Sequence, residues 1–114
     1  MQVHTPEKTA VYENLVKLEY ERQCGGRAFA EKVMLRMDVK AYFEIPKSTS
    51  KKAREAMLIG AIRPTKKPDV DNLIKTIADA CNALAYHDDS QIVQATVEKY
   101  YSDNPRVEVT IVDI

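Results

Sequence analysis

The chain has 114 residues, 45% hydrophobic and 30% charged, with a formal net charge of zero at neutral pH. This size and balance predict one globular domain with a real core and exclude a disordered chain. Zero net charge does not by itself indicate a nucleic-acid partner, and no apolar run is long enough to span a bilayer. The two cysteines lack metal-ligand spacing, so we expect free thiols in a cytoplasmic protein.

The first half of the chain predicts a helix followed by a strand. Thr5-Pro6-Glu7 supplies a capping hydroxyl, a proline at the first helical position and an acid in the first turn. Apolar residues then recur at helical spacing until Gly25-Gly26, which predicts a helix from about residue 6 to residue 24. Residues 32–45 alternate apolar and polar side chains, as in a strand with one buried face.

The second half predicts two helices and two strands. Ser48-Thr49-Ser50 can cap a short helix over residues 51–59, and a longer amphipathic helix should begin near Asp71. Residues 92–101 and 107–111 alternate like strands, and the turn residues between them favour an antiparallel hairpin. The expected fold class is α+β, a single domain in which a small mixed sheet of three strands packs with two main helices and one short helix.

Positive charge is concentrated between residues 45 and 68, where seven Lys and Arg residues stand against one Glu. Such a run is usually a solvated, flexible loop. Here it leads directly into an acidic cluster, which favours docking of a polyanion beside a metal ion. The candidate polyanion-binding residues are Lys47, Lys51, Lys52, Arg54, Arg63, Lys66 and Lys67.

Two acidic clusters stand at the two ends of the longer amphipathic helix: Asp69-Val70-Asp71-Asn72 and His87-Asp88-Asp89-Ser90. Asp69 and Asp71 point the same way in an extended segment, and Lys75 follows Asp71 by one helical turn. If the next strand returns beside the loop that precedes the helix, Asp89 can complete a cage of three carboxylates. Such a cage needs a cation, and oxygen ligands favour Mg²⁺ or Mn²⁺ over zinc.

Simpler interpretations of both clusters remain open. Asp71 can be only the N-cap of the helix, and Asp88-Asp89-Ser90 only a turn before a strand. Each cluster alone favours this simpler interpretation, whereas the two together with Lys75 and the basic segment favour a site. An EF-hand is excluded, because the sixth and twelfth positions counted from Asp69 hold Ile74 and Ala80.

Three stretches of the chain resemble the RusA family of Holliday junction resolvases. They are Lys67-Pro68-Asp69-Val70-Asp71-Asn72-Leu73-Ile74-Lys75, Asp79-Ala80 and His87-Asp88-Asp89-Ser90-Gln91-Ile92. Thr5-Pro6-Glu7-Lys8-Thr9 also resembles the start of that family's first helix, so the likeness covers nearly the whole chain.

The resemblance implies that residues 1–114 form one homodimeric endonuclease domain, dependent on Mg²⁺ with Mn²⁺ as a substitute, that cuts four-way DNA junctions by symmetrical nicks. It implies that Asp69, Asp71 and Asp89 are the essential carboxylates and metal ligands, with Asp88 as an auxiliary acid. Lys75 would be an essential basic residue, and the basic residues of 47–67 would bind DNA. Such proteins are typically encoded in phages and prophages.

Two features depart from the family pattern. Relatives usually carry a strand and a basic segment upstream of the Thr-Pro-Glu-Lys stretch, so we expect that strand to be missing from the sheet. Relatives also often have Asn-Gly after the longer helix, where this chain has Asn82-Ala83. Two other functions stay open: a DNA-binding protein without activity, and a nuclease that acts on flaps or replication forks.

Overall fold

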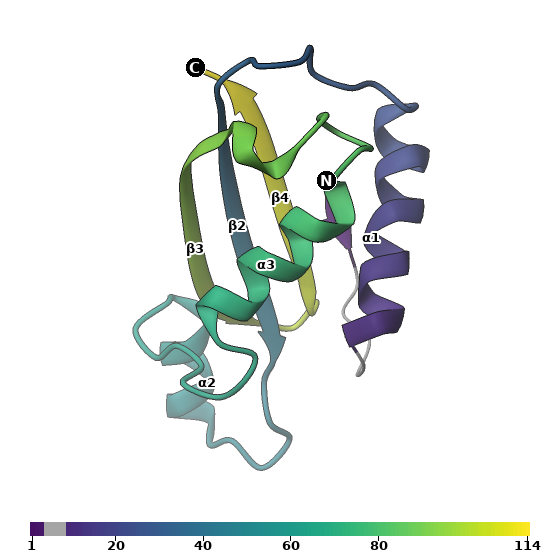
Figure 1. Ribbon diagram of the computed structural model, residues 1–114. Coiled ribbons are helices and arrows are strands. Elements are labelled where there is room, and N and C mark those ends of the chain that lie inside the picture. Colours follow the sequence, from purple (N-terminus) through teal and green to yellow (C-terminus); the bar gives the residue numbers. More distant parts are fainter. Residues whose placement is uncertain (4–8) are drawn as a thin grey trace.

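The computed structural model describes residues 1–3 and 9–114 as a four-stranded mixed sheet with two of its helices packed on one face (Figure 1). Strands β1 (Gln2–Val3), β4 (Arg106–Asp113), β2 (Leu35–Glu44) and β3 (Ile92–Ser102) lie in that order across the sheet. The central β2 is antiparallel to β4 and parallel to β3. The predicted α+β class is therefore confirmed, but the expectation that the strand before α1 would be missing is wrong: β1 pairs with β4 over two residues and makes the sheet four-stranded.

The described residues form three α-helices, α1 (Thr9–Cys24), α2 (Lys51–Leu58) and α3 (Val70–Cys81). Helix α1 ends where Gly25 and Gly26 both take positive φ angles, as their sequence predicts; the start expected at residues 6–8 lies outside the described residues. The Ser50 hydroxyl accepts a hydrogen bond from the Ala53 amide at 3.2 Å, which confirms the predicted cap of α2. No helix among residues 1–3 and 9–114 is long and apolar enough to cross a membrane.

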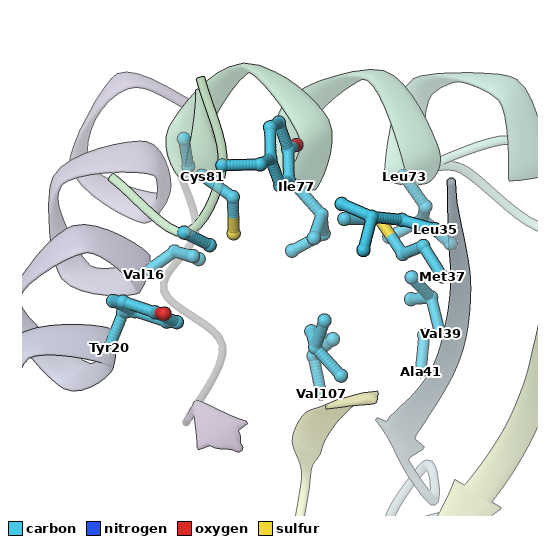
Figure 2. Packing of buried hydrophobic residues seen from close by; sticks show 14 residues of the cluster. Val16, Tyr20, Leu35, Met37, Val39, Ala41, Leu73, Ile77, Cys81 and Val107 are labelled. Atoms are coloured by element: carbon cyan, nitrogen blue, oxygen red, sulfur yellow. The ribbon is translucent and has the colours of Figure 1, made fainter. Parts of the chain in front are cut away.

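The core lies between one face of the sheet and helices α1 and α3 (Figure 2). Every second residue of β2 from Leu35 to Ala41 faces it and is buried, as the alternating pattern predicts. Helix α3 contributes Leu73, Ile77 and Cys81 from one stripe. The thiol of Cys81 is fully buried, and this burial raises its pKa to about 11, whereas Cys24 is only half-buried; both cysteines are free.

The predicted hairpin between residues 92–101 and 107–111 is wrong. Strands β3 and β4 are consecutive in the chain, but both pair with β2 and lie on its two sides. The parallel pairing of β2 with β3 requires a long crossover, which residues 45–91 provide with α2 and α3. Turn residues at 102–105 show that the chain reverses direction there, but they do not indicate which strand β4 pairs with.

The face of the sheet opposite α3 carries a column of stacked side chains that holds the start of the crossover. Arg106 of β4 lies 3.8 Å from the ring centroid of Tyr42, which stacks on Tyr100 of β3 at 5.5 Å. Arg63 of the crossover lies 4.3 Å from the Tyr100 ring on the same face. Tyr100 is thus part of the strand packing, and it ties the crossover to the sheet.

Candidate active site

Asp69 and Asp71 lie together at the N-terminal end of α3. Asp69 occupies the N-cap position with an extended backbone (φ −70°, ψ 159°), and its side chain makes no capping hydrogen bond. Asp71 stands in the first turn, so the interpretation of Asp71 as the cap is wrong. Both side chains are exposed, as is Lys75 one turn later. The positive end of the helix dipole makes this a favourable place for two carboxylates.

Two lysines border this acidic pair where the crossover passes the ends of β2 and β3. The Lys99 ammonium of β3 donates a hydrogen bond to the carbonyl of Lys66, three residues before Asp69. The amino groups of Lys99 and Lys66 lie 5.1 and 5.9 Å from the ring centroid of Phe43. Positive charge is therefore held at the segment that leads into Asp69, an arrangement suited to binding a phosphate close to a cation.

The second acidic cluster forms a structured turn before β3. Asp88 caps a short 3₁₀ helix, Asp89–Gln91, and accepts a hydrogen bond from the Ser90 amide at 3.4 Å. The buried Gln91 carboxamide accepts from the amides of His87 and Asp88 and donates to the carbonyls of two residues in the loop before β2. The simpler interpretation as a capped turn thus accounts for Asp88, whereas Asp89 has no part in the capping.

Asp89 has acidic neighbours of its own. Burial raises its pKa, and the adjacent Asp88 and the charge of Asp79 on α3 raise it further. Hydrogen bonds from Ser90 lower the pKa of Asp88, so the two neighbouring carboxyls are pushed in opposite directions. Asp79 was not among the predicted site residues; the signal for it was its position on the polar stripe of α3, two turns after Asp71.

Within one chain the two acidic clusters lie at opposite ends of α3. The helix has 12 residues and is therefore about 18 Å long. Asp89 precedes the start of β3, whereas Lys99, which contacts Lys66, lies roughly 23 Å further along that strand. Among residues 1–3 and 9–114, no three His, Cys, Asp or Glu side chains are grouped closely enough to hold a metal ion.

The expected three-carboxylate cage is thus not assembled by a single chain. The cage requires that β3, the strand after α3, begins beside the loop that precedes α3. Because β3 runs parallel to β2, it starts at the opposite end of the sheet, and Asp89 starts with it. The catalytic roles of Asp69, Asp71, Lys75 and Asp89 remain predictions.

The seven candidate polyanion-binding residues fall into two groups. Arg54 forms an ion pair with Asp103, and Arg63 packs on Tyr100, so both hold the crossover in place. The lysines are exposed and are distributed along the crossover: Lys47, Lys51, Lys52, Lys66 and Lys67. Exposed lysines on a segment fixed to the sheet give a positively charged stretch of chain that leads into Asp69 and Asp71.

Comparisons with known proteins identify the family of the chain. The sequence profile of the family Endodeoxyribonuclease RusA matches residues 1–112. The chain is 54% identical over 80 residues to the uncharacterized protein YqaN of Bacillus subtilis (strain 168), covering 68% of the chain and 56% of YqaN. It is 39% identical over 51 residues to the crossover junction endodeoxyribonuclease rusA of Lactococcus phage r1t, covering 44% of the chain and 39% of that protein. The chain therefore belongs to the RusA family of endodeoxyribonucleases.

Proposed function

We propose that this chain is a Mg²⁺-dependent endonuclease that resolves four-way DNA junctions by symmetrical nicks. The observation that carries the proposal is the exposed pair Asp69 and Asp71 at the N-terminus of α3, followed by Lys75 and preceded by the lysine-rich crossover. Family membership supports the reaction class, and the name of the phage relative supports a junction substrate.

The donor chemistry of the acidic pair fits a hard divalent cation. Asp69 and Asp71 offer carboxylate oxygens, the ligands that Mg²⁺ and Mn²⁺ prefer. Two carboxylates do not complete the ligand set of such a cation, and Asp89 does not join them within one chain. A divalent ion bound there would supply an activated water and stabilise charge on the phosphate.

The chain's own basic residues would position the DNA. Lys75 is exposed one turn from Asp71, where its compact charge can hold the scissile phosphate as negative charge develops on it. The lysines of the crossover would hold the duplex arms through backbone phosphates, which gives affinity without reading sequence. A two-fold dimer would match the near-symmetry of a four-way junction and place one nick in each of two strands.

Replacing one carboxylate separates binding from cutting. Asp71→Asn should abolish nicking of a synthetic four-way junction in Mg²⁺, while junction binding measured in EDTA by fluorescence anisotropy stays within about twofold of wild type. Asp113→Asn, an exposed carboxylate at the end of β4, is the matched control and should cut normally. An Asp71→Asn protein that cuts at the wild-type rate would disprove the mechanism.

A panel of substrates distinguishes the other two functions. Four-way junctions, flaps and replication forks of equal arm length should be compared at one enzyme concentration. Preferential cutting of flaps or forks would identify a nuclease for other branched DNA. Junction binding with no nicking in either Mg²⁺ or Mn²⁺ would identify a DNA-binding protein without activity.

A further inference from the structure

One aromatic ring on the face of the sheet that α3 covers holds two ammonium groups. Lys99 of β3 stands opposite the buried Ala41 of β2, and Phe43 follows Ala41 by two residues, so both side chains lie on this face. The ammonium groups of Lys99 and Lys66 lie 5.1 and 5.9 Å from the Phe43 ring centroid. The ring attracts both cations, which are at most about 11 Å apart.

The Lys99 ammonium is held in a defined position. Lys99 is half-buried, and its ammonium donates a hydrogen bond to the Lys66 carbonyl. An ammonium group has three N–H donors, so two remain after this bond. The side chain therefore offers further donors at a place that the Phe43 ring and the Lys66 carbonyl fix.

The two charges have no anionic partner within the described part of the chain. No ion pair among residues 1–3 and 9–114 includes Lys66 or Lys99. Glu98, the neighbour of Lys99, lies on the opposite face of β3, where it accepts a hydrogen bond from the Tyr100 hydroxyl. An anion from outside the chain would offset the repulsion between the two cations, so this place favours one.

This lysine pair stands on the segment that leads into the candidate active site. Lys66 precedes Asp69 by three residues, a separation of at most roughly 10 Å along the chain. We propose that Lys66 and Lys99, held on Phe43, bind one backbone phosphate of the DNA next to the bond that is cut. The inference rests on the proposed function and adds to it a contact from β3, outside the lysine-rich crossover.

The contact would position the substrate strand. A phosphodiester has two unesterified oxygens, so it can accept from two ammonium groups at once. Such contacts carry no sequence information, but they fix the register of the strand against the carboxylates of Asp69 and Asp71. Lys99 binds a phosphate that does not react, so it contributes to affinity in the bound substrate as well as in the transition state.

The salt dependence of junction binding in EDTA tests the site without metal or activity. Lys99→Met keeps most of the side chain against Phe43 and removes its charge. The slope of log affinity against log salt should fall by about one for Lys99→Met and for Lys66→Met, and by about two for the double variant. Lys99→Arg keeps the charge and should keep the slope. Lys40→Met, exposed on the face opposite α3, is the matched control and should bind like the wild type.

Lys66→Met provides an independent measurement if Lys99→Met does not fold, because Lys66 is exposed on a loop. Urea denaturation shows whether each variant is folded. A wild-type slope in a folded Lys99→Met protein, or in Lys66→Met, would overturn the proposal.

Neutral methylphosphonate linkages test for a direct contact with phosphate. Four-way junctions that each carry one neutral linkage near the branch point are compared by fluorescence anisotropy in EDTA. One linkage should weaken binding by the wild type and have no effect on binding by Lys99→Met, because that variant has already lost the contact. If Lys99 only ties the crossover to β3, each linkage should cause the same loss in both proteins, and this result would refute the contact.

Kinetics in Mg²⁺ separate this role from that proposed for Lys75. Lys99→Met should raise KM by a larger factor than it lowers kcat, because the contact is made before the reaction. Lys75→Met should act mainly on kcat, since its charge is proposed to act on the transition state. A Lys99→Met protein that binds substrate normally and loses kcat would contradict the proposal.

The outcomes keep this inference apart from the proposed function. A chain that nicks junctions while Lys99→Met behaves like the wild type in all three assays would refute the phosphate site and leave the endonuclease assignment standing. A chain that never nicks, but whose binding depends on Lys99 and on one linkage, would support a phosphate contact and refute the assignment.

Discussion

Asp88 and Asp89 are neighbours in one turn but have different surroundings. The sequence alone does not distinguish the two. Asp88 caps the turn before β3 and has its pKa lowered by hydrogen bonds from Ser90. Asp89 takes no part in the capping and is partly buried beside Asp79. The local hydrogen bonding therefore gives Asp88 a structural role at this turn, whereas the role of Asp89 stays a prediction.

The cap predicts different effects for two substitutions of Asp88. Asp88→Ala removes the capping acceptor and should lower the free energy of unfolding slightly but measurably, whereas Asp88→Asn keeps an acceptor and should be nearly neutral. Urea denaturation measures both variants. Nicking by the two should stay close to wild type; a loss as complete as that expected of Asp71→Asn would show that Asp88 has a role in catalysis.

Ala83, after α3, has a φ angle of +61°, a left-handed conformation that costs an L-residue about 1 kcal/mol. This explains why the family's usual glycine suits the position. Ala83→Gly should raise the free energy of unfolding by about 0.5–1 kcal/mol. Ala53→Gly, inside α2, is the matched control and should lower it by a similar amount. A destabilised Ala83→Gly in thermal unfolding would contradict this account.

At the scale of elements, β2 holds the sheet together on both sides. Its Asp38 accepts a hydrogen bond from the Thr96 hydroxyl of β3 at 2.6 Å and pairs with Arg36 at 3.1 Å. Thr96, and then Arg36, lower the pKa of Asp38 below its ordinary value. These contacts link the strand that leads into the crossover to the strand that returns from it.

This link predicts a pH-dependent loss of stability. A carboxyl with a lowered folded-state pKa stabilises the fold above its ordinary pKa of about 3.9, and this stabilisation disappears as the pH falls through the folded-state value. Asp38→Asn should therefore lower the free energy of unfolding by about 1 kcal/mol at neutral pH. The difference from wild type should shrink below about pH 4. If urea denaturation gives the same difference in unfolding free energy between wild type and Asp38→Asn at every pH, this account is contradicted.

At the scale of the whole molecule, net neutrality hides an uneven distribution of charge. The positive charges of the crossover are fixed to one end of the sheet by the Tyr42–Tyr100 column and by the Arg54–Asp103 ion pair. Acidic residues gather at the other end, around Asp79 and Asp89. A positive surface at one end is the arrangement by which a neutral chain could bind a polyanion, as proposed above.

The polarity predicts how junction binding depends on salt. The double variant Lys51→Ala and Lys52→Ala should weaken binding of all junction sequences alike and reduce the slope of log affinity against log salt by up to about two. Lys40→Ala, exposed on the face opposite α3, is the matched control and should leave the slope unchanged. Fluorescence anisotropy across a salt series measures both slopes. Equal slopes for the wild type and the double variant would exclude this part of the crossover from DNA binding.

Most of the elements and half of the candidate site could be predicted from the sequence. The ends of α1 and α2 follow from Gly25-Gly26 and the Ser50 cap, and the buried face of β2 follows from its alternation. Asp69 and Asp71 are neighbours in the chain, so their proximity at the start of α3 follows from local geometry. Each of these features depends on interactions within a few residues, which the sequence displays directly.

The sequence by itself determined the fold class, the helices and the three long strands, the acidic pair with its lysine and the family, but not the short strand β1. Only the tertiary structure decided that β3 pairs with β2 rather than with β4, and that Asp89 lies at the far end of α3 from Asp69. The reason is that strand pairing joins residues more than fifty positions apart, and periodicity reports which face of a strand is buried but not which strand lies beside it. One parallel pairing thus separates the two acidic clusters within a chain.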